Sequence, residues 1–245
     1  MDHPVVSRDA WWKARVALLE QEKAFTRLKD ELSAARRQLP WVEVDKVYEF
    51  DGPDGPVTLA DLFRGRDQLF VKHFMLPPGQ KDPCIGCSFE VDHLAGILVH
   101  LENHGVSYVA IGRAPIEEIE ALRRRMGWTF PFVSSYRSDF NYDFQVSFTP
   151  AQMEAGKAIY NYREVAPGMA DYSGDSVFLK GEDGRIYHTY STFGRGGEQF
   201  LGAYGFLDVM PKGRGEHGPH HSLGDWVRLR DAYGRAEPGC GCEGT

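Results

Sequence analysis

The sequence predicts an α/β domain with a central mixed sheet flanked by helices, a long N-terminal helix and a C-terminal extension. Strand-like and helix-like patterns alternate between residues 69 and 126, and a β-hairpin pattern follows near residue 176. Two strands joined by a crossover helix pair in parallel, whereas a hairpin adds antiparallel strands. A mixed sheet follows from the two patterns together.

Composition fits a folded domain. The chain has 245 residues, of which 42% are hydrophobic, so it can bury a sizeable core. Its net charge of -7 gives no general attraction to nucleic acid or anionic lipid. No stretch approaches the roughly 18 consecutive apolar residues of a membrane span. We expect a soluble cytoplasmic protein with neither a nucleic acid nor a membrane as partner.

The first element is a long amphipathic helix over Trp11–Leu39, within an N-terminal extension of residues 1–45. Its apolar residues recur every three or four positions, Ser7 can cap its start, and Pro40 can end it. Such a stripe favours packing along the chain's own domain or against a second copy in a homodimer.

The main domain is expected over residues 46–210. We predict a strand at Lys46–Phe50, a turn, and a short strand leading into a helical turn at Val57–Phe63. Leu69–Leu76 is apolar and rich in β-formers, as a central strand should be. A loop that contains Pro77, Pro78, Gly79 and Pro83 then leads to Cys84.

Helical spacing of leucine and isoleucine predicts a helix within Ser88–Asn103, and Val106–Gly112 is the next strand. A helix over Ile116–Met126 follows, with Pro115 at its start. Trp128–Ser135 adds a short strand.

The remaining segments complete the expected fold. Residues 136–173 have no clean period and are expected to form an insertion, interpreted as a lid over the site. Ser176–Lys180 and Arg185–Tyr190 form a hairpin. Helices are expected near Gly197–Leu207 and Leu223–Tyr233, the second within a C-terminal helix and flexible tail of residues 211–245.

Cys84-Ile85-Gly86-Cys87 carries the predicted chemistry, because it lies between a strand and a helix at the head of a βαβ unit. A thiol at a helix N-terminus has a lowered pKa, since the helix dipole and free amides favour the thiolate. Cys84 is therefore the predicted attacking thiol. Cys87 is the predicted resolving thiol, which releases the partner from a mixed disulfide.

Two other interpretations of the pair stay open. Half of a zinc site would need a second pair of ligands, and buried cysteines can also be inert. A haem link is disfavoured because Ser88, not histidine, follows Cys87.

The sequence resembles a bacterial thioredoxin-like family of predicted dithiol–disulfide oxidoreductases. The resemblance runs from the N-terminal helix to about Tyr233 and rests on four blocks: Cys84 to Phe89, Met126-Gly127-Trp128, Ser134 to Phe144, and His188 to Thr192. It implies a thioredoxin-like fold with peroxiredoxin-like additions.

Two departures from better-understood relatives stand out. Thioredoxins place a cis-proline before the strand that faces the dithiol, but the corresponding stretch here, Gly174 to Val177, has none. Peroxiredoxins contain a motif that resembles P-x-x-x-T-x-x-C. In this sequence Pro77 and Cys84 have the spacing of its first and last residues, but Lys81 stands in place of the threonine. Peroxiredoxin-like thiol peroxidase activity is therefore the alternative rather than the first prediction.

Several residues are accessory candidates. Lys72, in the central strand, would stabilise the Cys84 thiolate if it is buried near it. Strict alternation puts His188 and Tyr190 on one face of the hairpin, where either could relay protons or have a structural role. Tyr142, with Asp139 and Asp143, could line a pocket or belong to a turn.

Two C-terminal groups have mixed metal-ligand chemistry. His217, His220 and His221 lie in one loop, and Cys240 and Cys242 follow in the tail. Metal or ligand binding on a thioredoxin scaffold is therefore a further alternative, as is a tail dithiol that passes electrons to Cys84 and Cys87.

The predicted function is thiol–disulfide exchange with a protein or small-molecule thiol or disulfide. Cys84 attacks, Cys87 resolves, and an external reductant resets the pair. No organic cofactor and no metal are required.

Overall fold

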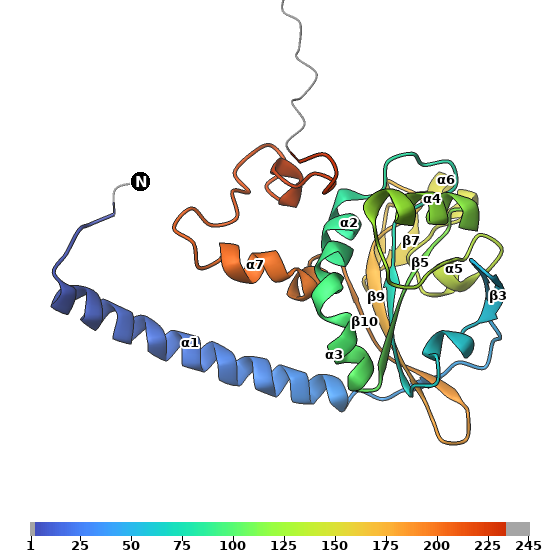
Figure 1. The fold of residues 1–245 in the computed structure, drawn as a ribbon, viewed down its shortest axis with the longest axis horizontal. Helices are drawn as coiled ribbons and strands as arrows, with labels where there is room; N and C mark the ends of the chain where they lie inside the picture. The colour runs from blue at the N-terminus through green and yellow to red at the C-terminus, as the bar shows by residue number, and fades with distance from the viewer. Residues whose placement is uncertain (1–2, 234–245) are drawn as a thin grey trace, which may run out of the picture. The chain divides into compact units, whose positions relative to one another are not determined.

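The computed structural model describes residues 3–233, and the chain divides between Trp41 and Val42 into two compact units. The first unit contains helix α1, Arg8–Arg37 (Figure 1). The Ser7 side chain accepts a hydrogen bond from the Ala10 N–H, as capping requires. Arg36 and Arg37 in the last turn complement the helix dipole. The predicted helix is confirmed, although it ends two residues before Leu39.

The second unit is built on an eight-stranded mixed sheet in the order β1-β10-β9-β4-β5-β6-β2-β3. Strand β4 is central, because it pairs in parallel with β5 and antiparallel with β9. The predicted α/β thioredoxin-like fold is confirmed. The strands are β1 Val42–Glu43, β2 Glu49–Gly52, β3 Gly55–Thr58, β4 Gln68–His73, β5 Val106–Gly112, β6 Phe132–Ser134, β9 Gly174–Lys180 and β10 Ile186–Phe193.

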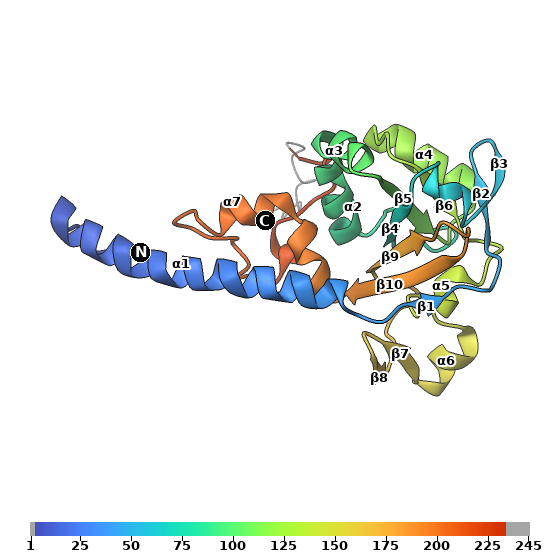
Figure 2. The ribbon, with the colours of Figure 1, turned by 90° about the horizontal axis from the view of Figure 1, so that it is seen from below.

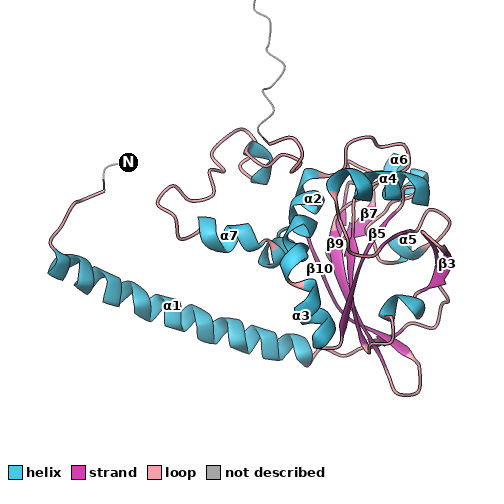
Figure 3. Cartoon of the chain, viewed as in Figure 1, coloured by secondary structure: helices cyan, strands magenta, loops and turns pink. Residues whose placement is uncertain are grey.

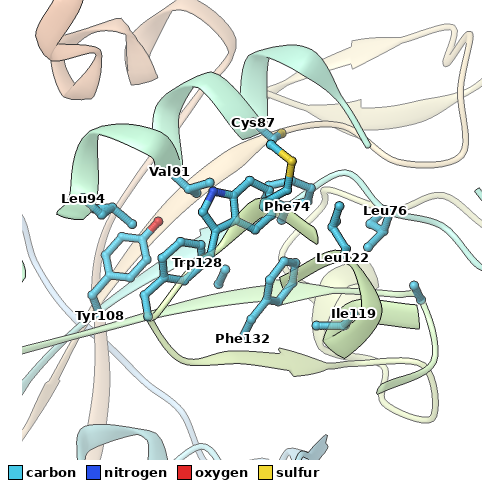
Figure 4. Close-up of a cluster of buried hydrophobic side chains, with 14 of the residues drawn as sticks. Phe74, Leu76, Cys87, Val91, Leu94, Tyr108, Ile119, Leu122, Trp128 and Phe132 are labelled. Atoms are coloured by element: carbon cyan, nitrogen blue, oxygen red, sulfur yellow. The ribbon is translucent and has the colours of Figure 1, made fainter. Parts of the chain in front are cut away.

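Helices α2, Ile85–Asp92, α3, Leu98–Asn103, and α4, Ile116–Met126, lie on one face of this sheet, above the strands in Figure 2. Figure 3 distinguishes the helices from the strands by colour. Burial drives this packing, since apolar side chains from helices and strands form one cluster, called here the dithiol-side core. Cys87 and Val91 come from α2 and lie over Phe74 and Trp128 (Figure 4). The dithiol helix is thus fixed to the sheet by the core beneath it.

The other face of the sheet carries a second cluster, called here the opposite-side core. The 3-10 turn Asp61–Phe63 and the short helix α5, Phe140–Asp143, cover it with Phe63 and Phe140, which are fully buried. Both faces of β4 are therefore buried. Because neither face meets water, the sequence Leu69–Leu76 is almost continuously apolar.

Two predicted elements differ in detail. The helix expected within Ser88–Asn103 is interrupted by a 3-10 turn at His93–Gly96, which buries Leu94. The insertion 136–173 has regular structure of its own: α5, α6 Pro150–Ala155, and the small sheet of β7 Ala158–Tyr160 with β8 Arg163–Val165, seen beside α6 in Figure 2.

The C-terminal segment folds more irregularly than predicted. The helix near Gly197–Leu207 is split into a 3-10 stretch, Gly194–Phe200, and helix α7, Gly202–Leu207. The helix predicted over Leu223–Tyr233 is wrong, because only a 3-10 turn forms at Leu223–Asp225. Trp226 follows with φ -140°, outside the helical region. Among the described residues, no helix is both long and apolar enough to cross a membrane.

Candidate functional site

The paired cysteines lie at the start of α2, just after the loop that leaves β4. Cys84 is the N-cap residue, and its Sγ accepts a hydrogen bond from the Cys87 N–H at 3.5 Å. Both thiols are reduced; Cys84 is partly exposed and Cys87 is buried. One sulfur is therefore accessible and the other lies one turn behind it.

The two thiols have opposite electrostatic environments. A hydrogen bond from the Cys87 thiol, helped by the N–H groups of Cys87 and Gly86 and by the charge of Lys72, outweighs burial and lowers the pKa of Cys84 to about 6. The hydrogen bond to Cys84, together with burial, raises the pKa of Cys87 well above its usual value. At neutral pH these shifts favour the thiolate at Cys84 and the thiol at Cys87.

A buried charge cluster lies beside the dithiol, formed by Lys72, Glu90 and Asp175. The Lys72 Nζ is 2.5 Å from a Glu90 carboxylate oxygen and 3.3 Å from an Asp175 carboxylate oxygen. It also donates to the Ser173 hydroxyl at 3.0 Å. Burial alone would lower the pKa of Lys72, but the two carboxylates raise it, so this lysine stays charged. Burial raises the pKa of Glu90 despite the attraction of Lys72.

The dithiol opens into a cavity of about 350 Å³. Its floor is formed by Cys84, Gly86, Cys87 and Glu90 of the dithiol helix. Ser173, which directly precedes β9, forms one wall. The other walls come from two C-terminal segments and contain Arg195, Glu198, Leu201, Tyr204, Glu216, His221 and Leu223.

The hairpin candidates are separated by a β-bulge, which corrects the alternation prediction. His188 pairs with Phe178 and Tyr190 pairs with Val177, so two steps on β10 match one step on β9. Tyr190 is consequently on the dithiol side of the sheet. His188 lies on the opposite side, against Phe144 and Phe178, and its Nε2 is 2.7 Å from the Ser191 hydroxyl.

The remaining candidates lie away from the two thiols. The Tyr142 hydroxyl accepts a hydrogen bond from Arg113, which also contacts Asp171. Asp143 accepts hydrogen bonds from Lys46 and Tyr48, and with them it lines a separate cavity. Lys81 is exposed and lies in another hollow, beside α4.

The residues considered as alternative metal ligands do not converge in the part of the chain that the structure describes. Within residues 3–233, no three His, Cys, Asp or Glu side chains gather in a way that would hold a metal ion. His221 instead lines the dithiol cavity. Cys240 and Cys242 lie outside the described residues.

Sequence reasoning missed Glu90, Asp175 and Ser173. Glu90 had a readable signal, because it follows Cys87 by three positions and so shares a face of the same helix. Asp175 required the strand register, in which it pairs directly with Lys72 across β4 and β9. Ser173 had no signal of its own in the sequence.

Comparison with known families gives one match that covers most of the chain. The family described as "Bacterial protein of unknown function (DUF899)" matches residues 1–233. The chain belongs to this family. It matches none of the curated proteins.

The chain is also similar to several solved structures, each at low sequence identity. Peroxidoxin BcpB from Mycobacterium tuberculosis has a TM-score of 0.44 and 14% identity, over 66% of this chain and 94% of that one. PrxQ from Xylella fastidiosa has a TM-score of 0.40 and 17% identity, over 65% and 87%. A thiol:disulfide interchange protein from Bacteroides sp. has a TM-score of 0.38 and 14% identity, over 75% and 99%.

Proposed function

We propose that this protein is a dithiol–disulfide oxidoreductase in which Cys84 attacks and Cys87 resolves. The observation that carries the proposal is the pairing of an accessible, low-pKa thiol at the N-cap of α2 with a buried thiol one turn later. A redox-active pair needs this asymmetry, because one sulfur must be a thiolate and the other must stay protonated until the second step.

The exchange proceeds in two balanced steps. The Cys84 thiolate attacks one sulfur of a substrate disulfide, forms a Cys84–substrate disulfide and releases the first substrate thiolate. Cys87 then gives its proton to the released substrate thiolate and attacks the Cys84 sulfur, which releases the second thiolate and leaves the Cys84–Cys87 disulfide. The substrate gains two electrons, and an external thiol reductant returns them to the protein.

The buried cluster supports this chemistry. The buried positive charge of Lys72 attracts the thiolate and so lowers the pKa of Cys84. Its own charge is retained because Glu90 and Asp175 flank it. We assign Lys72 the role of a positioning residue that stabilises the thiolate without touching the substrate. We also place the protein in the reducing cytoplasm, since its four cysteines are too few for a disulfide scaffold.

A redox titration tests the proposal. The purified full-length chain is equilibrated with mixtures of reduced and oxidised glutathione, and the Cys84/Cys87 peptide is identified by mass. We expect a reversible disulfide between these two residues, lost in Cys84→Ser and in Cys87→Ser. Failure to form it at any glutathione ratio would remove the oxidoreductase function.

A further inference from the structure

The dithiol is covered by the C-terminal part of the chain, which limits what can reach it. An ideal Cβ built on Gly86, between the two cysteines, would lie 3.6 Å from a methyl carbon of Leu223. Leu223 and Ser222 line one wall of the cavity, while Gly194, Arg195 and Gly197 line another. The surface around the two thiols is therefore a hollow rather than an open face.

This cover is fixed to the dithiol helix. The ring of Phe89, on α2, packs edge-on against Trp226 at a centroid distance of 5.5 Å. The His93 Nε2 accepts a hydrogen bond from the Ala203 N–H at 3.1 Å. Figures 1 and 2 both show α7 and its following segment beside α2. Segments from the two sides of the hollow are thus anchored to the helix that carries the cysteines.

The cover is also linked within itself. The Tyr204 hydroxyl donates to Glu216 at 2.6 Å, and Arg214 donates to Glu198 at 3.1 Å. The Asp225 carboxylate accepts the N–H groups of Gly218 and His220, which closes the loop before Leu223. Opening the hollow would require several of these contacts to break together.

We infer that the substrate of the Cys84/Cys87 pair is a low-molecular-weight disulfide, not a disulfide in a folded protein; this rests on the proposed function. A cavity of about 350 Å³ lies within the range of small-molecule sites, roughly 300–1,000 Å³. A protein disulfide brings two flanking chain segments with it, and the anchored walls on either side of the thiols narrow the approach that these segments need. One half of a small disulfide can enter and present its sulfur to Cys84.

The chemistry is the two-step exchange already described, with the pre-reduced protein as the electron donor. Cys84 takes one half of the small disulfide into a mixed disulfide and releases the other half as a thiolate. Cys87 displaces the bound half. Two molecules of small thiol leave for each Cys84–Cys87 disulfide formed.

Single-turnover kinetics test the inference. The fully reduced full-length protein is mixed with cystine, glutathione disulfide or insulin, and formation of the Cys84–Cys87 disulfide is followed by peptide mass. We expect the second-order rate constants for the two small disulfides to exceed that for insulin by at least about tenfold, because steric exclusion acts on the larger substrate. Insulin reacting as fast as the small disulfides would overturn the inference while leaving the oxidoreductase function intact. No reaction with any of the three would remove the function itself.

A matched pair of variants tests the cause. Leu223→Ala removes a side chain over Gly86, and we expect it to raise the ratio of the insulin rate to the cystine rate. Val209→Ala shortens an exposed side chain that does not line the hollow, and we expect it to leave this ratio unchanged. An unchanged ratio in Leu223→Ala, in a variant whose Cys84–Cys87 disulfide still forms, would contradict the covering role.

Discussion

The hydrogen bond between the two thiols should set most of the reactivity of Cys84. Cys87→Ala removes the donor, whereas Cys87→Ser replaces the thiol with a hydroxyl that can still donate. Both variants lack the resolving thiol, so they differ in the hydrogen bond and little else. We expect a clearly higher Cys84 pKa in Cys87→Ala than in Cys87→Ser, because the contact with Cys87 is the largest cause that lowers it.

The magnitude follows from the size of the depression. The pKa falls from 9.0 to about 6, and these three units correspond to about 4 kcal/mol. A hydrogen bond to a charged group contributes about 1.5–3 kcal/mol, or about one to two units. The Cys84 pKa in Cys87→Ala should therefore be about 7–8. The N–H groups of Cys87 and Gly86 and the charge of Lys72 supply the rest and also offset burial, which raises the pKa.

The assay is the pH dependence of the thiolate ultraviolet absorbance, with Cys240→Ser and Cys242→Ser in both backgrounds so that the signal reports Cys84. Alkylation by iodoacetamide, located at Cys84 by peptide mass, gives an independent midpoint. Equal Cys84 pKa values in the alanine and serine variants would refute the account of the hydrogen bond.

Three further predictions follow from the same geometry. Lys72→Met leaves buried carboxylates without their cation, so the free energy of unfolding in a urea titration should fall by about 3–5 kcal/mol, and the Cys84 pKa should rise. Glu90→Gln keeps the contact with Lys72, so its free energy of unfolding should fall by less. In the reduced protein the pKa of Cys84 is about 6 when folded and near 9.0 when unfolded. The Cys84 thiolate therefore stabilises the folded protein, relative to Cys84→Ser, by up to about 4 kcal/mol above pH 9. This stabilisation is lost as the pH falls to about 6. Equal pH profiles would contradict this. Gly174→Ala places a Cβ 2.8 Å from the ring of Phe193, so the melting temperature should fall, in line with the loss of about 1–3 kcal/mol typical of overpacking; an unchanged melting temperature would contradict it.

The repeating patterns of the sequence predicted the fold well where one face or both faces are buried. Val106–Gly112 and Ile116–Met126 have the predicted bounds, because a buried strand and an amphipathic helix leave strong periodic signals. A helix was also expected over Leu223–Tyr233, but the Ser222–Asp225 capping contacts close a single turn there. A local pattern does not report such competing side-chain contacts.

The candidate site was predictable to the extent that it is local in sequence. The N-cap position of Cys84 followed from the strand, loop and helix around it. Its partners come from distant segments, so their placement depends on strand register, and a single bulge moved His188 to the opposite side from Tyr190. The cover over the dithiol has no periodic signal, because it is built from turns held by side-chain contacts.

The most direct test of the roles assigned to Cys84 and Cys87 is the mass of the product formed with one equivalent of cystine. Wild-type protein should lose two hydrogens as the Cys84–Cys87 disulfide forms. Cys87→Ser should instead keep half a cystine on Cys84, and Cys84→Ser should react far more slowly at this site. A mixed disulfide that persists in the wild type, or a Cys84→Ser variant that reacts through Cys87 at the wild-type rate, would contradict the account.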